Sequence, residues 1–207
     1  MVTVGGDSAA VERRLAAGGL ACPGCSGVLA GWGHARPRVV RGSARVLRVC
    51  PRRARCVGCG ATHVLLPAGL LLRRADTAVV IGAALQARAG GAGHRRIAAL
   101  LGRPAETVRG WLRRFAGRAG AVRRLFTVLQ RAVAPDLVMP GPAGSGWADA
   151  VAAIGAAAAA VAGRFAVFTL PVWGWVSAVS GGRLLAPGWP RVVDQHELTL
   201  TWWWPGR

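Results

Sequence analysis

The sequence contains no lysine, and only eight of its 207 residues are acidic. All 27 cationic side chains are therefore arginines, and the formal net charge is +19. A charge of this size and sign favours a polyanionic partner. Arginine in place of lysine, with abundant alanine and glycine, is also typical of a high-GC coding sequence, and such a bias alone raises the positive charge.

The N-terminal segment MVTVGGDSAAVERR lacks the apolar stretch of a signal peptide and carries acidic residues early. The five cysteines are odd in number, and four of them form two C-x-x-C pairs. This arrangement argues against disulfides and for metal binding in a reducing compartment. We therefore expect a cytoplasmic protein. Hydrophobic residues make up 53% of the chain, which excludes wholesale disorder.

The positive charge is confined to the first two thirds of the chain. Up to Ala134 there are 23 arginines and four acidic residues, whereas from Pro135 onward there are four of each. Compositional bias alone would not separate the charge in this way. The distribution predicts a basic module joined to a neutral one.

The residue patterns predict a mainly α fold with a small β zinc ribbon. Alternating apolar and basic residues at Val39–Val49 predict a β-hairpin, and Ala9–Ala17 predicts a short helix. Pro171 interrupts the apolar C-terminal region, which predicts two helices. The predicted segments are a lead-in at 1–20, a zinc ribbon at 21–66, a helix-turn-helix domain at 75–131, a Pro- and Gly-rich linker at 135–146, and Ala-rich helices with an irregular tail at 147–207.

The two C-x-x-C pairs supply Cys22, Cys25, Cys56 and Cys59. Each pair places two thiolates on one metal, and four ligands complete the tetrahedron that structural zinc prefers, leaving no open position for catalysis. The glycine in third position of each pair suits a tight turn that directs N–H groups at sulfur. A redox dithiol is the alternative, but it needs only one pair in a βαβ setting.

Several neighbouring side chains keep open roles at this stage. Cys50 is a buried thiol, a substitute ligand or a surface residue, and His34 and His63 are further candidate ligands. The arginines between the cysteine pairs form either a solvated face or a set of phosphate contacts. They are Arg36, Arg38, Arg41, Arg45, Arg48, Arg52, Arg53 and Arg55.

The segment Gly93–Phe115 has the pattern of a helix-turn-helix. A first helix is expected at about His94–Leu101, with an inward face of Ile97, Leu100 and Leu101. Gly102 suits the left-handed residue that ends such a helix, and Pro104 suits the first turn of the next. In that second helix the expected buried residues are Val108, Trp111, Leu112 and Phe115.

The opposite face of the second helix would be free to enter a DNA major groove. Arg109 and Arg113 lie one turn apart and could reach guanine edges or phosphates. A preceding helix at about Thr77–Ala89, capped by Asp76, would complete a three-helix unit. A plain helical hairpin with arginine on its wet side is the alternative. The expected DNA-binding residues are Arg95, Arg96, Arg103, Ala105, Glu106, Arg109, Gly110, Arg113 and Arg114.

Residues 20–186 resemble a family of uncharacterised zinc-ribbon/helix-turn-helix proteins of high-GC bacteria. The first half is also similar to the DNA-binding end of bacterial transposases, which implies DNA binding and a mobile-element origin. The matching motifs are Cys22–Cys25, Trp32-Gly33, Arg36–Arg38, Cys56–Cys59, Thr62–Pro67, Gly93–Ala98 and Gly181–Leu185.

We expect no enzymatic activity. An RNase H-type transposase core needs three acidic residues that hold two metal ions in a strand-rich domain, and the region after the linker is Ala-rich with four acidic residues. Arg164 and Pro171 interrupt the apolar stretch Val151–Val179, which argues against a membrane span. Its helices would pack on the DNA-binding part or form a homodimer.

Three functions stay open from the sequence. The first is a regulator or accessory protein that binds double-stranded DNA. The second is a remnant or DNA-targeting half of a transposase. The third is a zinc-ribbon module that binds another protein.

Overall fold

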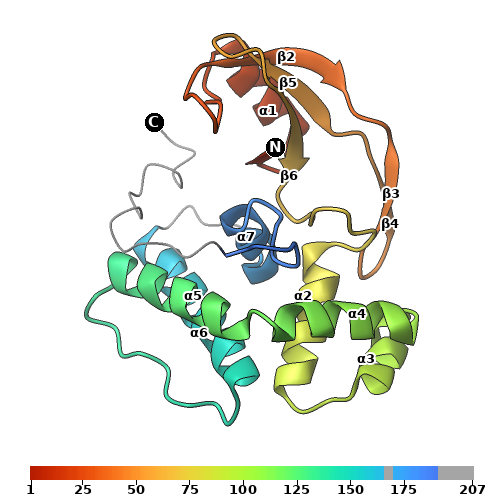
Figure 1. The fold of residues 1–207 in the computed structure, drawn as a ribbon, viewed down its shortest axis with the longest axis vertical. Coiled ribbons are helices and arrows are strands. Elements are labelled where there is room, and N and C mark those ends of the chain that lie inside the picture. The colour runs from red at the N-terminus through yellow and green to blue at the C-terminus, as the bar shows by residue number, and fades with distance from the viewer. Residues whose placement is uncertain (166–169, 191–207) are drawn as a thin grey trace.

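The computed structural model describes residues 1–165 and 170–190 (Figure 1). Strands occupy the first third of the chain and helices most of the remainder, so the fold is mainly α with a small β part. The strands are β1 (Val2–Val4), β2 (Leu29–His34), β3 (Arg38–Arg41), β4 (Val46–Val49), β5 (Arg52–Cys56) and β6 (Thr62–Pro67). The helices are α1 (Ser8–Ala16), α2 (Ala78–Ala89), α3 (His94–Leu101), α4 (Ala105–Ala116), α5 (Ala119–Val133), α6 (Gly146–Arg164) and α7 (Val172–Val179).

The larger sheet has the strand order β1-β6-β5-β2, with β1 parallel to β6 and the other pairs antiparallel. The strands β3 and β4 form a separate two-stranded hairpin, as the alternation at Val39–Val49 predicts. Helix α1 begins after Asp7, whose carboxylate accepts a hydrogen bond from the Ala9 N–H. It buries Val11 and Leu15 in the core of the sheet.

Residues 1–20, predicted as a lead-in, belong instead to the β part. Val2 lies opposite Leu65, and the predicted short helix is α1, shifted by one residue. A three-residue strand has too few residues for an alternating pattern, and its partner lies about 60 residues away. The sequence alone therefore offered nothing from which to predict β1.

Helices α2 to α7 share one hydrophobic core. Pro171 is the N-cap of α7, so the predicted break in the C-terminal region is present. Trp173 of α7 packs directly on Gly82 of α2, where a Cβ atom would lie 2.0 Å from the indole ring. Only glycine permits this close approach, so the crossing of α2 and α7 depends on the absence of one methyl group.

Helix α6 is long and apolar enough to cross a membrane, judged by length and composition alone, with a mean hydropathy of 1.4. It lies beside α5 (Figure 1) and buries Ala150, Ala153, Ile154 and Ala157 in the shared core. One side of α6 therefore packs on its own chain, and 39% of its apolar window is buried. The predicted Trp-rich tail, Trp202–Trp204, lies outside the described residues.

Candidate metal centre and basic helical surface

The two cysteine turns have the same backbone design. Ser26 and Gly60, each directly after the second cysteine of a pair, have φ of 60° and 73°. The N–H of Ser26 donates to the Cys22 carbonyl, and the N–H of Gly60 donates to the Cys56 carbonyl. The left-handed residue is thus the one after each pair. Gly24, the predicted turn glycine, directs its N–H at the Cys22 sulfur, 3.4 Å away, as expected of a turn that aims N–H groups at sulfur.

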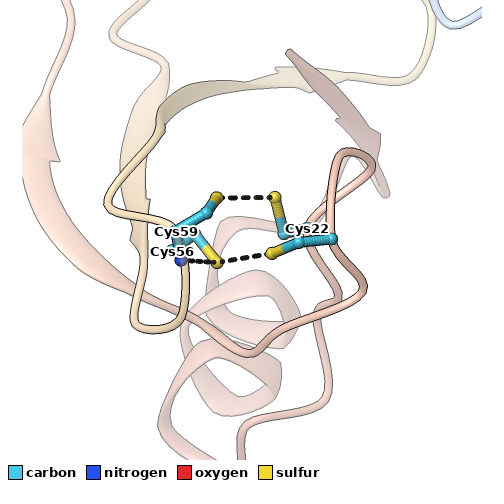
Figure 2. Close-up of side chains that lie close together, drawn as sticks. Cys22, Cys56 and Cys59 are labelled. Atoms are coloured by element: carbon cyan, nitrogen blue, oxygen red, sulfur yellow. Dashed lines mark hydrogen bonds between the residues drawn. The ribbon is translucent and has the colours of Figure 1, made fainter.

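These turns bring all four predicted cysteines together. Their Sγ atoms lie within 4.8 Å of one another. The Cys22 and Cys59 sulfurs are 3.8 Å apart, and those of Cys25 and Cys56 are 3.4 Å apart. In Figure 2 the sulfur of Cys22 faces that of Cys59 across the gap between the two turns. Four tetrahedral bonds of about 2.3 Å would separate neighbouring sulfurs by roughly 3.8 Å, so the cluster could hold a metal ion.

The thiols of this cluster differ in acidity. Hydrogen bonding from the Cys59 N–H lowers the pKa of Cys56 to about 6, despite burial. The Gly24 N–H likewise lowers the pKa of Cys22. For Cys25 the Gly27 N–H lowers the pKa, but the neighbouring thiols of Cys56 and Cys59 outweigh it and raise the pKa to about 12. Four sulfurs this close cannot all be thiolates without a cation between them.

Of the remaining candidate ligands, His34 and Cys50 form no contact with the four sulfurs, whereas His63 contacts one of them. His34 is exposed on β2, and Cys50 is exposed, with its thiol donating to the Ala35 carbonyl at 3.3 Å. His63 is buried, and its Nε2 lies 3.4 Å from the Cys22 sulfur. An imidazole at that distance supports the sulfur from outside the ligand set, as the partners of metal ligands commonly do.

The predicted helices of the basic region are present. Helix α3 ends at Gly102, which is left-handed with φ of 60°, and Pro104 is the N-cap of α4. Helix α4 buries Val108, Trp111, Leu112 and Phe115, as expected. In α3, however, Leu100 was wrongly predicted to point inward, because 75% of it is exposed. The buried arc of α3 runs from Ile97 toward Ala98, and at 100° per residue Leu100 falls about 60° outside it.

The residues predicted to contact DNA form two groups. On α3, Arg95 and Arg96 are exposed in the first turn. On α4, the exposed side chains include Glu106 and Arg109, which form an ion pair of 3.5 Å, and Arg113. Arg114 is exposed and donates to the Gly110 carbonyl, and Gly110 and Ala105 are half-buried. The cationic face of α4 lies opposite its buried face.

Arg103 differs from the others. Its guanidinium donates to Asp76 at 2.6 Å, and only 13% of its side chain is exposed. Arg41 also holds Asp76, through two hydrogen bonds of 3.1 and 2.7 Å. Asp76 was predicted to cap α2, but Thr77 is the N-cap, and the Asp76 carboxylate is buried between the two arginines. Arg103 therefore makes structural contacts within the chain.

Asp76 is the functional residue that sequence reasoning assigned incorrectly. It is the sole acidic residue between Glu12 and Glu106, in a stretch rich in arginine. A lone carboxylate among so many cations points to an ion pair rather than to a helix cap. Its two partners are distant in the sequence, so their identity needed the structure.

A search of protein-family models, curated proteins and solved structures finds no match to this chain.

Proposed function

We propose that this protein binds double-stranded DNA through α3 and α4 acting as a helix-turn-helix, beside a zinc ribbon held by Cys22, Cys25, Cys56 and Cys59. The observation that carries the proposal is the two-sided helix α4. One side is buried by large apolar residues, and the other presents arginines to solvent. A helix of this kind, held by its neighbour through a left-handed turn, suits insertion into a major groove about 12 Å wide.

Base recognition is assigned to Arg109 and Arg113. A guanidinium can donate two hydrogen bonds to the O6 and N7 atoms of guanine. Arg109 is 58% exposed in its side chain and is paired with Glu106 at 3.5 Å, an exposed contact of low strength that a guanine or a phosphate can replace. At Gly110, between them in sequence, the Arg114 guanidinium lies over the helix backbone and donates to the Gly110 carbonyl.

Phosphate contact is assigned to α3. The N-terminus of α3 has no side-chain cap, so its first N–H groups are available to an anion. Arg95 and Arg96 are exposed in that same turn. Phosphate contacts of this type fix the register of a protein on the duplex, whereas the arginines of α4 would read its sequence.

The zinc assignment follows from the ligand chemistry. Four sulfur ligands at tetrahedral spacing suit zinc or iron, and with all four positions occupied by protein the ion would serve folding rather than catalysis. The identity of the metal is tested by elemental analysis of the purified protein. One zinc per chain supports the assignment, and iron or no metal contradicts it.

The proposed reading helix is tested with the double variant Arg109→Ala plus Arg113→Ala. Each bidentate base contact contributes about 1–3 kcal/mol of discrimination, so the preference for a selected sequence over random duplex should fall by roughly 30-fold or more. The matched control is Arg124→Ala plus Arg131→Ala, which removes two exposed arginines from α5. Equal sequence preference in both variants and the wild type would refute the assignment.

A protein-binding module is the second candidate, because Leu100 is 75% exposed on α3. Among the exposed large apolar side chains of α2 to α4, Leu100 is the most exposed, so a partner of the helical part would be tested there. Leu100→Ser distinguishes the two functions. If α4 reads DNA, Leu100→Ser should leave duplex binding unchanged. If the protein is a protein-binding module, the same change should abolish partner binding.

A further inference from the structure

The β3–β4 hairpin is fixed to the turn between α3 and α4. The Arg103 guanidinium in that turn donates to the Gly42 carbonyl at 2.8 Å and to Asp76 at 2.6 Å. On the hairpin, Arg41 donates to Asp76 and also pairs through its backbone with Ala75 and Thr77. A buried carboxylate shared by two guanidiniums is costly to separate, because removing one partner leaves uncompensated buried charge. The hairpin is therefore joined to the turn between α3 and α4 at Asp76.

The two faces of the hairpin have opposite character. Val40 and Leu47 form a cross-strand pair on the inner face, and Val40 is fully buried against Leu66 and Leu70. Successive strand residues alternate between faces, so the outer face carries the pairs Val39–Arg48 and Arg41–Val46. Val39 and Val46 are 59% and 65% exposed. The outer face thus combines apolar side chains with the arginine of each pair.

Of the eight arginines between the cysteine pairs, Arg36, Arg38, Arg45, Arg48 and Arg53 form no ion pair within the described residues, whereas the other three have partners. Arg41 binds Asp76, Arg52 forms an ion pair of 2.7 Å with Glu12, and Arg55 stacks over the Trp32 ring at 5.0 Å. Of the five without an ion pair, Arg45 and Arg48 are exposed and lie in the β3–β4 hairpin. Arg45 lies in the turn of the hairpin, which closes through a hydrogen bond from the Gly42 N–H to its carbonyl.

We propose that the outer face of the β3–β4 hairpin is a second DNA-binding surface, with Arg45 and Arg48 contacting phosphates beside the groove that α4 enters. The inference rests on the proposed function. Arg45 lies in the same tight turn as Gly42, and that turn contacts the turn between α3 and α4. Arg48 lies three residues after Arg45, about 10 Å further along the strand. The contact of Arg103 with Gly42 places the turn of the hairpin beside the turn that precedes α4.

Charge selects the DNA backbone as the occupant of this face. Between Glu12 and Asp76 the sequence has no acidic residue. The Asp76 carboxylate that Arg41 holds is buried and also paired with Arg103, so it does not oppose a phosphate beside Arg45 and Arg48. Val39 lies opposite Arg48 on the neighbouring strand, and Val46 lies two residues before Arg48 on the same strand. Both would contact the apolar edges of the sugars. A groove-side contact of this kind adds affinity but no sequence preference.

The test is the full-length, metal-loaded variant Arg45→Ala plus Arg48→Ala, compared with Arg124→Ala plus Arg131→Ala. Both pairs remove two exposed charges, so the comparison separates position from total charge. Binding to a selected duplex and to a random duplex is measured across a salt series, with a hydroxyl-radical footprint. Arg45→Gln plus Arg48→Gln serves as a second variant if the alanine variant fails to fold.

The hairpin variant should bind both duplexes about 2- to 30-fold more weakly than the wild type. Its log–log salt slope should be smaller by about 2, and the footprint should lose protection on one side of the α4 site only. If the hairpin variant matches the α5 control in slope and footprint while the wild type binds DNA, this inference is overturned and the proposed function stands. If the wild type binds no duplex, the proposed function itself fails.

Discussion

At the metal centre, Cys25 and Cys56 differ in pKa although their sulfurs are 3.4 Å apart. Backbone N–H groups stabilise the Cys56 thiolate and bring its pKa to about 6, whereas nearby thiols raise that of Cys25 to about 12. Near neutral pH the metal-free centre thus has Cys56 mainly deprotonated and Cys25 protonated. Metal binding requires four thiolates, so it must expel the proton of Cys25.

Zinc binding near neutral pH should therefore release protons, and the apparent affinity should fall as pH falls because protons compete for the sulfurs. Proton release is measured with an indicator dye in weakly buffered protein. Cys25→Ser should release fewer protons on zinc binding. Its zinc affinity should fall by more than the roughly 10- to 100-fold that removal of an outer partner of a ligand causes. Cys50→Ser, the control, should match the wild type. Normal loading of Cys25→Ser would contradict the four-sulfur site.

At the scale of elements, what the sequence could predict depends on how local the cause is. The cysteine turns, α3 and α4 were predictable, because C-x-x-C spacing, Gly102 and the step from Val108 to Phe115 are local features. The pairing of β1 and the Asp76 contacts were not, because their partners are distant in the chain. Leu100 was misplaced because an eight-residue helix has too few apolar positions to fix which side of Ile97 is buried.

The contact of α2 with α7 gives an element-scale prediction. Gly82→Ala should destabilise the fold by about 1–3 kcal/mol, because its Cβ would lie 2.0 Å from the Trp173 ring. The matched control is Gly155→Ala on α6, where no atom lies within 4 Å. That change should stabilise the fold by roughly 0.5–1 kcal/mol through helix propensity. Denaturant unfolding measures both. Equal stability of the two variants would mean that α7 does not pack on Gly82.

The whole molecule has two main cores that are separate clusters. One lies in the β part and includes Cys22 and Cys56, and the other joins α2 to α7. The metal would stabilise only the first directly, because the four cysteines lie at the end of β5 and in the turns of the β part. The helical core has large buried residues of its own, such as Phe115 and Phe126.

Chelation of the metal should therefore unfold the β part and leave the helices largely intact. Hydrogen exchange should show lost protection in β5 and β6, with α4 and α5 still protected. Far-ultraviolet circular dichroism should keep most of its helical signal. Complete loss of helix on chelation would show that the two cores are not independent, and an unchanged β part would show that no structural metal was bound.

The central claim is that α4 reads double-stranded DNA. It is tested most directly by selecting duplexes from a random pool with the full-length, zinc-loaded protein and measuring binding across a salt series. The account predicts a recovered sequence motif, a steep salt dependence, and loss of the motif in Arg109→Ala plus Arg113→Ala. Weak binding without any motif would contradict it and leave the arginines of the first two thirds as a general positive charge.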